Sequence, residues 1–209
     1  MSPRPRTASD TEIFAATARA VSRVGPGRLT LADVAGDVGL TPAALIRRFG
    51  SKRSLLLAFV NHGPSMVEDC FVTVRAAHAS PLAALIAAAA NMADHVRSPD
   101  ELVNSLTFLQ IDLTDSEFRR PALEHSKQVL AGYEALIRDA VDAGELMACN
   151  VTAVARAVQA VTGGSLITWA IHREGVAGQF VRRDLETILA PLCGRAARPR
   201  KRTRRPRAR

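Results

Sequence analysis

The chain has 209 residues, enough for one or two domains with a sizeable core; 47% of them are hydrophobic, but only 4% are aromatic. Alanine and leucine dominate and no alternating β-branched run bounded by turns occurs, so the composition predicts an all-α fold and disfavours a sheet. No apolar stretch reaches membrane-spanning length and the N-terminal residues lack the apolar segment of a signal peptide, so we expect a cytoplasmic protein with no membrane partner.

The net charge of +8 is divided unevenly along the chain. Residues 1–63 hold nine basic and four acidic side chains, residues 64–194 hold ten and sixteen, and residues 195–209 hold nine and none. A basic N-terminal part indicates an anionic partner such as nucleic acid, whereas the acidic middle argues against DNA wrapping the whole molecule. The three cysteines lie far apart in the sequence, which is typical of reduced packing cysteines.

Residues 1–8 are predicted to form a flexible arm that precedes a first helix. Ser9 and Glu12 stand at the spacing of a capping box, in which the two side chains satisfy amides of the opening turn. Gly25-Pro26-Gly27 is expected to end the helix. One side of this helix is predicted to be buried through Ile13, Phe14, Thr17, Val21 and Val24.

Residues 29–59 are typical of two short helices joined by a tight turn, followed by the start of a third. Thr30, with Asp33 in the capping-box position, begins the first short helix, and Gly39 ends it where a left-handed backbone favours glycine. Thr41 caps the second helix, and Pro42 occupies its first position, where the N–H that proline lacks is not needed.

The spacing of Ala35, Gly39 and Leu45 lets two helices cross closely around a turn, which is the geometry of a helix-turn-helix motif. An ordinary helical hairpin with a solvated basic face is the alternative, because patterns of small residues and glycine are common. The outward side of the second helix is predicted to present Thr41, Pro42, Ala43, Ala44, Arg47 and Arg48.

The run LTLADVAGDVGLTPAALIRRFGSKRSLL resembles the N-terminal signature of the TetR family of bacterial transcriptional regulators. In that family a T-x-x-x-V-A-x-x-x-G block precedes a Y-x-x-F-x-S-K-x-x-L block. Ile46 departs from this pattern, because the family commonly has a tyrosine there that contacts a DNA phosphate; Arg47 and Arg48 are candidates to replace that contact. The positions that match are Thr30, Val34, Ala35, Gly39, Phe49, Ser51, Lys52 and Leu55.

The resemblance implies a double-stranded DNA operator as partner and a nucleoid-associated location. Base-edge contact is expected where small side chains can meet thymine methyl groups, at Thr41, Ala43 and Ala44, with Pro42 beside them. Phosphate contacts, which set the register on the duplex, are expected from Thr30, Arg47, Arg48 and Lys52.

Residues 9–63 are thus predicted to form a three-helix DNA-binding head, and residues 64–194 a larger helical ligand-binding and dimerisation domain. Asn61-His62-Gly63-Pro64 is expected to break or kink the chain between them. Since the fourth helix of TetR-family proteins links the two domains, this point would be the transmission joint. Further helices are expected over residues 81–96, 99–113, 121–141, 152–172 and 179–192.

The last two predicted helices resemble the closing helix pair of TetR-family proteins, which packs against its copy in a second subunit as a four-helix bundle. The helix over residues 152–172 is apolar on more than one face, which favours cover on several sides. Gly163 and Gly164 in its middle favour the close approach of a partner helix or a ligand. A homodimer through these helices is expected; the alternative is a fully buried helix in a monomer.

The resemblance also implies a cavity for a small-molecule effector, and the residues favour an apolar effector with few charges. For each candidate taken singly, core packing is the simpler explanation. No cofactor is expected. The candidate ligand-binding residues are Met66, Phe71, Met92, His95, Phe108, Tyr133, Gln159, Thr162 and Trp169.

Enzymatic or metal chemistry is not indicated. The five histidines form no metal-binding pair, and neither a glycine-rich phosphate loop nor a nucleophile with a neighbouring base is evident. Asp112, Asp115 and Glu117 cluster near a helix end, where they could hold a cation, cap a helix or simply be solvated.

The tail, residues 195–209, is basic throughout and interrupted by proline, which predicts disorder. It is either a solubilising extension or an electrostatic arm that adds sequence-independent affinity for DNA. Together these features predict a homodimeric repressor that a ligand releases from a palindromic operator. The alternative is a helical small-molecule carrier without sequence-specific DNA binding.

Overall fold

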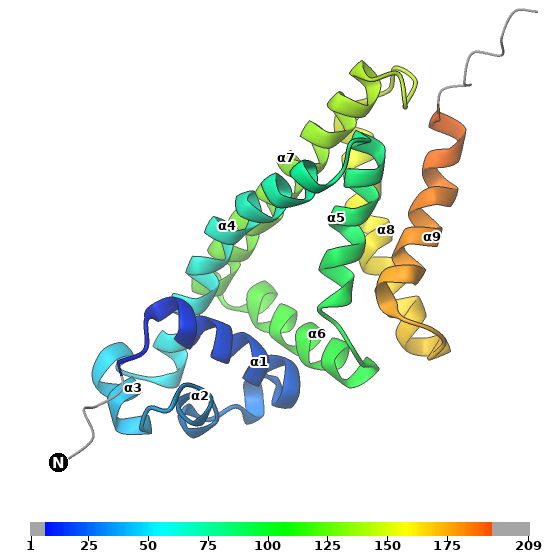
Figure 1. Ribbon diagram of the computed structural model, residues 1–209. Coiled ribbons are helices and arrows are strands. Elements are labelled where there is room, and N and C mark those ends of the chain that lie inside the picture. The colour runs from blue at the N-terminus through cyan, green and yellow to red at the C-terminus, as the bar shows by residue number, and fades with distance from the viewer. Residues whose placement is uncertain (1–6, 194–209) are drawn as a thin grey trace, which may run out of the picture.

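The structure is a computed structural model that describes residues 7–193, except for the side chains of residues 64–66. In this part of the chain the regular elements are helices, with one isolated β-bridge between Leu146 and Cys193. The predicted all-α fold, with a helix-turn-helix head and a larger helical domain, is therefore confirmed (Figure 1). The first six residues of the predicted arm and the whole predicted basic tail lie outside the described residues.

The head consists of α1 (Asp10–Arg28), α2 (Leu31–Val38), α3 (Pro42–Phe49) and the first turns of α4 (Lys52–Ala77), at the lower left of Figure 1. Helices as short as α2 and α3 are marginal alone, so their ends must be stabilised. The predicted caps do this: the hydroxyls of Ser9, Thr30 and Thr41 each accept a hydrogen bond from the amide three residues later. Gly39, at φ 69°, provides the left-handed turn between α2 and α3.

The helical backbone of α1 is interrupted at Gly25, where φ is 77° and ψ is 157°, so the predicted stop falls at the right place. A contact from the second domain explains the need for glycine. Asn104 donates to the carbonyl of Ser22 at 2.7 Å, and a Cβ at Gly25 would lie 2.6 Å from the Oδ1 of Asn104. The end of α1 is therefore shaped around α6 (Pro99–Thr114).

The break expected at residues 61–64 does not occur, because α4 continues from the head into the second domain as one helix (Figure 1), and the alternative of a kink stays a prediction. A proline inside a helix removes one hydrogen bond, at about 3 kcal/mol. The buried face of α4 offsets this loss: Val67 and Val74 pack into the core of the second domain, and α4 runs alongside α7 (Ser116–Asp142). The boundary expected between residues 63 and 64 falls inside this helix, and the domain limits stay a prediction.

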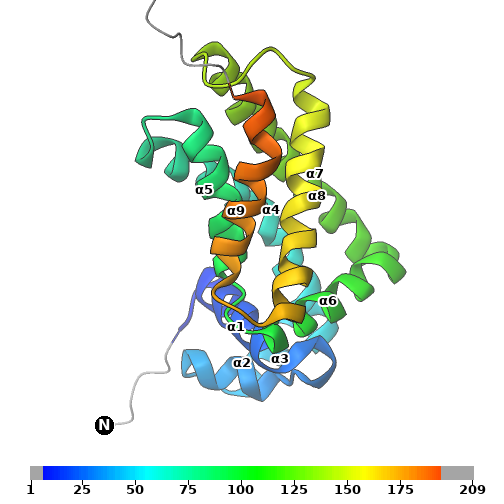
Figure 2. The ribbon, with the colours of Figure 1, turned by 90° about the vertical axis from the view of Figure 1, so that its right-hand side faces the viewer.

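The second domain contains α5 (Pro81–Asp94), α6, α7, α8 (Val151–His172) and α9 (Ala177–Leu189), which the 3-10 turn η1 (Ala190–Leu192) follows. Most of α5 is buried among the other helices, and α8 and α9 lie side by side on one face (Figure 2). α7 begins at Ser116 rather than at residue 121 as predicted, because the Asp115 carboxylate caps it by accepting from the Glu117 amide at 3.0 Å. None of the described helices is long and apolar enough to cross a membrane.

The hydrophobic core of the head extends beyond the head itself. Phe108 of α6 and Phe118 of α7 pack with Ile13 and Leu55 in one buried cluster. The Phe108 ring lies edge-on to both Phe59 and Phe118, with centroid distances of 6.3 and 6.1 Å. The three-helix head predicted from the sequence is thus completed by side chains of the second domain.

Candidate DNA-binding surface and ligand cavity

Helix α3 is anchored on one side and exposed on the other. Leu45 is fully buried in the head core, whereas Pro42, Ala43 and Arg47 are exposed and Ile46 keeps 51% of its surface. Ala44 is half-buried at the edge of the same face. The exposed surface predicted for this helix is therefore present.

The cations on and beside α3 differ in what they contact. Arg48 donates to the carbonyl of Ala8 at 2.6 Å and pairs with Asp10 at 2.8 Å. Lys52 donates at 3.1 Å to a backbone carbonyl near the end of α1. Arg47 has no hydrogen bond or ion pair among the described residues. Arg48 and Lys52 thus hold the head together, and Arg47 is free to meet a phosphate.

The two threonines predicted to face DNA are also capping residues. The Thr30 hydroxyl donates to Asp33 at 2.6 Å, and this hydrogen bond lowers the pKa of Asp33. The Thr41 hydroxyl accepts from the Ala44 amide at 3.2 Å, which leaves its own proton for another acceptor. Thr41 is therefore better placed than Thr30 to donate to DNA.

Arg53, at the start of α4, links the head to the corner between α6 and α7. Its guanidinium donates to Asp115 at 2.7 Å, pairs with Glu117 at 2.6 Å and lies over the Phe118 ring, 5.4 Å from the centroid. The hydrogen bond from Arg53 holds the pKa of Asp115 below its ordinary value. The predicted acidic cluster thus binds a protein cation and caps a helix. No group of three potential metal ligands occurs among the described residues.

A cavity of about 540 Å³ lies where α4 meets the helices of the second domain, and this size suits a drug-sized ligand. Most of its wall is apolar, with side chains from five helices: Phe59 of α4, Met92 of α5, Phe108 of α6, Val129 of α7 and Leu166 of α8. Because Phe108 also belongs to the head core, one aromatic ring borders both the cavity and the head.

Most polar groups at the cavity already have partners. Gln159 donates to the hydroxyl of Ser126 at 3.1 Å, which joins α8 to α7. The Tyr133 hydroxyl donates to the sulfur of Met92 at 3.3 Å, and burial raises the pKa of Tyr133 to about 12. The Thr162 hydroxyl donates to a carbonyl of its own helix at 2.8 Å. These groups therefore offer a ligand little beyond shape.

Two further ionisable side chains line the cavity. The Oδ1 atom of Asp112 is buried and has no hydrogen-bond partner, and burial raises the pKa of this carboxyl to about 6. His125 lies opposite Gly63 of α4, and burial lowers the pKa of its imidazole. None of the described residues that line the cavity is a lysine or an arginine.

The residues predicted to bind a ligand do not all lie together. His95 is exposed and borders a separate shallow recess beside Cys70. Trp169 is buried in the core, where its indole donates to the carbonyl of Gly175 at 3.2 Å. The side chain of Met66 lies outside the described residues. The predicted residues that border the cavity are Met92, Phe108, Tyr133, Gln159 and Thr162.

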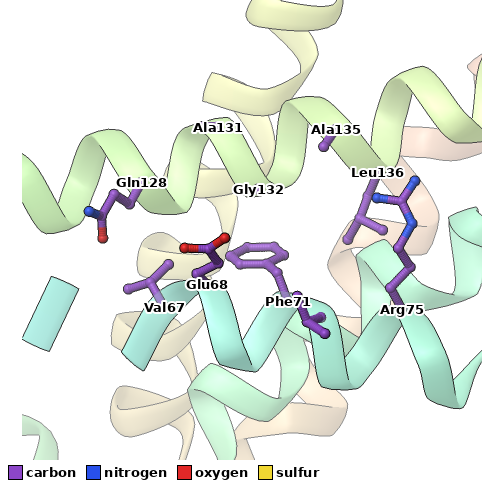
Figure 3. A pocket seen from close by; sticks show the side chains of 10 residues that line it. Val67, Glu68, Phe71, Arg75, Gln128, Ala131, Gly132, Ala135 and Leu136 are labelled. Carbon is purple, nitrogen blue, oxygen red and sulfur yellow. The ribbon is translucent and has the colours of Figure 1, made fainter. Parts of the chain in front are cut away.

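Phe71, also predicted to bind a ligand, lies in a second groove of about 390 Å³ between α4 and α7. Figure 3 shows its ring rising from α4 toward Gly132 of α7, with Glu68 and Arg75 on either side. A Cβ at Gly132 would come within 2.5 Å of the ring, which also stacks edge-on against Tyr133 at 5.4 Å. Phe71 therefore packs behind the main cavity and joins α4 to α7.

Asp112 and His125 border the cavity but were not among the residues predicted to bind an effector, although Asp112 belongs to the acidic cluster that could hold a cation. A local signal for Asp112 was available, because Phe108 and Asp112 are four residues apart and so share one face of α6. No comparable signal exists for His125, since its place depends on the contact of α7 with Gly63 of α4.

The outward face of α8 is apolar and uncovered in the single chain. Ile167 and Ile171 expose 47% and 75% of their surfaces, and a Cβ at Gly163 or Gly164 would meet nothing within 4 Å. The alternative of a fully buried helix in a monomer is therefore wrong. This face is open to the close approach of another helix.

Residues 13–59, which include α2, α3 and the start of α4, match the family model described as bacterial regulatory proteins, tetR family. The head is a TetR-family domain. The resemblance seen in the sequence is thereby confirmed, and the exposed helix α3 is the second helix of the TetR-family helix-turn-helix. No curated protein matched the sequence.

Solved structures share the TetR-like arrangement over most of the chain. A TetR transcription regulator from Haloarcula marismortui has a TM-score of 0.71 at 20% identity and covers 88% of this chain and 97% of its own. A transcriptional regulator from Saccharomonospora viridis in complex with choline has a TM-score of 0.70 at 17% identity, and the match covers 89% of this chain and 98% of that chain. FadR from Bacillus subtilis in complex with stearoyl-CoA has a TM-score of 0.67 at 14% identity, and the match covers 88% of this chain and 100% of that chain. At such identities the likeness shows the fold alone.

Proposed function

We propose that this protein is a homodimeric transcriptional repressor that binds a palindromic DNA operator through α3 and leaves it when a small molecule fills the cavity. The observation that carries the proposal is the position of Phe108, which borders the cavity and packs in the head core. Side chains in a densely packed core cannot move independently. A ligand that displaces Phe108 therefore shifts the head, and with it the angle of α3.

On DNA, Arg47 contacts a phosphate, and Thr41, Pro42 and Ala43 lie at the base edges. Ile46, exposed where the family commonly has tyrosine, supplies apolar contact only. Arg48 and Lys52, which were predicted to contact phosphates, take a positioning role in this proposal, because Arg48 pairs with Asp10 of α1 and Lys52 donates to a carbonyl near the end of α1.

The dimer forms through the open face of α8 together with α9, where Gly163 and Gly164 let a partner helix approach closely. Two heads then present two copies of α3 to successive turns of one DNA face, which requires a two-fold operator. The effector is a mostly apolar small molecule. The solved relatives hold choline or stearoyl-CoA, so the shared fold does not fix the ligand. The protein acts in the cytoplasm and catalyses no reaction.

Fluorescence anisotropy with the full chain and labelled DNA from upstream of its own gene tests this proposal. We expect salt-dependent binding with a preference for one palindromic site, and Arg47→Ala should weaken binding to every sequence without changing the preferred site. A carrier without regulatory function would show no palindrome preference. A changed site preference in Arg47→Ala would contradict the phosphate contact.

A further inference from the structure

The cavity contains one charge that no described residue balances. Among the described residues that line it, Asp112 is the one carboxylate, and no lysine or arginine lies beside it. The Oδ1 atom of Asp112 is buried without a hydrogen-bond partner. Because an unpaired buried polar atom costs free energy, a ligand that donates a hydrogen bond to this oxygen gains more here than in water.

The position of Asp112 on α6 makes the cavity more negative. Asp112 lies in the last turn of the helix, where carbonyl groups without partners carry partial negative charge, and no basic residue stands in that turn. The acids that follow in the sequence, Asp115 and Glu117, are bound by Arg53. Asp112 is the member of this acidic cluster that lacks a cation.

The remaining polar groups offer an anion little. One of the two N–H donors of Gln159 is used by Ser126, and the Tyr133 hydroxyl donates to the sulfur of Met92. Burial lowers the pKa of His125, so its imidazole is neutral at pH 7. Asp112, with a pKa of about 6, is mostly ionised at that pH. The lining therefore has a net negative charge.

We propose that the effector is a lipophilic amine whose protonated nitrogen donates to Asp112 while its apolar body lies against Phe59, Phe108 and Leu166. This inference rests on the ligand-responsive function proposed above. A carboxylate ligand would meet a like charge, and a neutral hydrocarbon would leave Asp112 unpaired.

Isothermal titration calorimetry with three probes of equal chain length tests the proposal on the full chain at pH 7: decylamine, decan-1-ol and decanoic acid. We expect decylamine to bind about tenfold or more tightly than either of the others, since hydrogen bonds to charged groups are the stronger ones. Asp112→Asn, which keeps the shape of the side chain, should reduce decylamine binding to the level of decan-1-ol. Asp112→Glu should retain the preference for the amine. Asp142→Asn, at an exposed site away from the cavity, serves as the matched control and should behave as the wild type.

Equal or tighter binding of decanoic acid, unchanged decylamine binding in Asp112→Asn, or no binding of any probe would each overturn the inference. If Asp112→Asn does not fold, the order of the three probes on the wild-type chain decides. Operator binding is measured separately on the same preparations. A chain that prefers the amine but binds no operator would contradict the proposed regulator and leave the ligand assignment standing. A chain that binds the operator but shows no preference for the amine would contradict the ligand assignment and leave the proposed regulator standing.

Discussion

The head and the second domain are both helical, but the residues whose contacts form each candidate site are close in sequence in the head and far apart in sequence in the second domain. In the head, Thr30, Gly39 and Thr41 fix the ends of α2 and α3 through contacts that span a few residues. The cavity is formed by side chains from Phe59 to Leu166, on five helices. The comparison teaches that a surface built on one short helix is encoded locally, whereas a cavity is the outcome of many distant contacts.

The two regions also share a feature. In each, most charged side chains near the candidate site have internal partners, as Arg48 has Asp10 and Asp115 has Arg53. Among the described residues, Arg47 on α3 has no such partner, and the Oδ1 atom of Asp112 in the cavity has no hydrogen-bond partner. We propose that both groups meet a ligand, a phosphate for Arg47 and a cation for Asp112.

The largest effect is expected from the residue that anchors α3. Leu45→Ala removes a fully buried side chain and should lower the free energy of unfolding by about 2–5 kcal/mol. The adjacent Ile46→Ala, at a half-exposed site, should stay within about 0.5 kcal/mol. Chemical denaturation followed by circular dichroism measures both. Similar losses for the two variants would show that α3 is buried on both sides, which would contradict the DNA-binding surface.

A smaller effect, in binding, is expected from the two arginines of α3. Arg47→Ala should weaken operator binding by about 1–2 kcal/mol and reduce the salt dependence by roughly one phosphate contact, with stability unchanged. Arg48→Ala should instead lower the free energy of unfolding more than it weakens operator binding, because it removes the ion pair with Asp10 and the hydrogen bond to the carbonyl of Ala8. Anisotropy titrations at several salt concentrations and thermal melts separate the two. Equal effects of both variants on the salt slope would remove the distinction drawn between them.

This comparison also explains how far the sequence could predict the structure. The caps of α1, α2 and α3 were predictable because donor and acceptor lie within three residues. The continuity of α4 through residues 61–64 could not be predicted, because the packing that offsets the hydrogen bond lost at proline is with α7, which lies far along the chain. The pairing of Arg48 with Asp10 and the place of His125 in the cavity depend likewise on tertiary contacts. Sequence reasoning thus located the exposed face of α3 and only part of the cavity.

In the second domain, the unpaired carboxylate should reduce stability at neutral pH. Burial raises the pKa of Asp112 from 3.8 to about 6, so the folded state binds the proton more tightly than the unfolded state. This destabilisation is present above pH 6 and disappears as the pH falls toward 4. After allowance for solvent screening, Asp112→Asn should raise the free energy of unfolding at pH 7 by about 1 kcal/mol. Denaturation of both proteins between pH 4 and 7 measures this, and a variant less stable than the wild type at pH 7 would show that Asp112 has a structural partner.

The smallest effect on stability is expected at Arg53, which joins the two regions. Arg53→Ala removes exposed ion pairs with Asp115 and Glu117, so stability should change only slightly. Arg53 holds the pKa of Asp115 below its ordinary value of 3.8. The small stabilisation from this ion pair is therefore fully present above pH 3.8 and is lost as the pH falls through the lowered pKa of Asp115.

The informative measurement on Arg53→Ala is therefore the change that decylamine binding causes in operator affinity, rather than the stability of the variant. Asp112 and Asp115 are three residues apart at the end of α6. A cation bound at Asp112 therefore lies about one helical turn from the ion pair between Arg53 and Asp115. We expect the variant to bind decylamine as the wild type does, while the effect of decylamine on operator affinity is reduced but not lost, because the core around Phe108 remains. Arg119→Ala, at an exposed site on α7, is the matched control and should leave that effect intact. An undiminished effect in Arg53→Ala would mean that the signal reaches the head through the shared aromatic core around Phe108 alone.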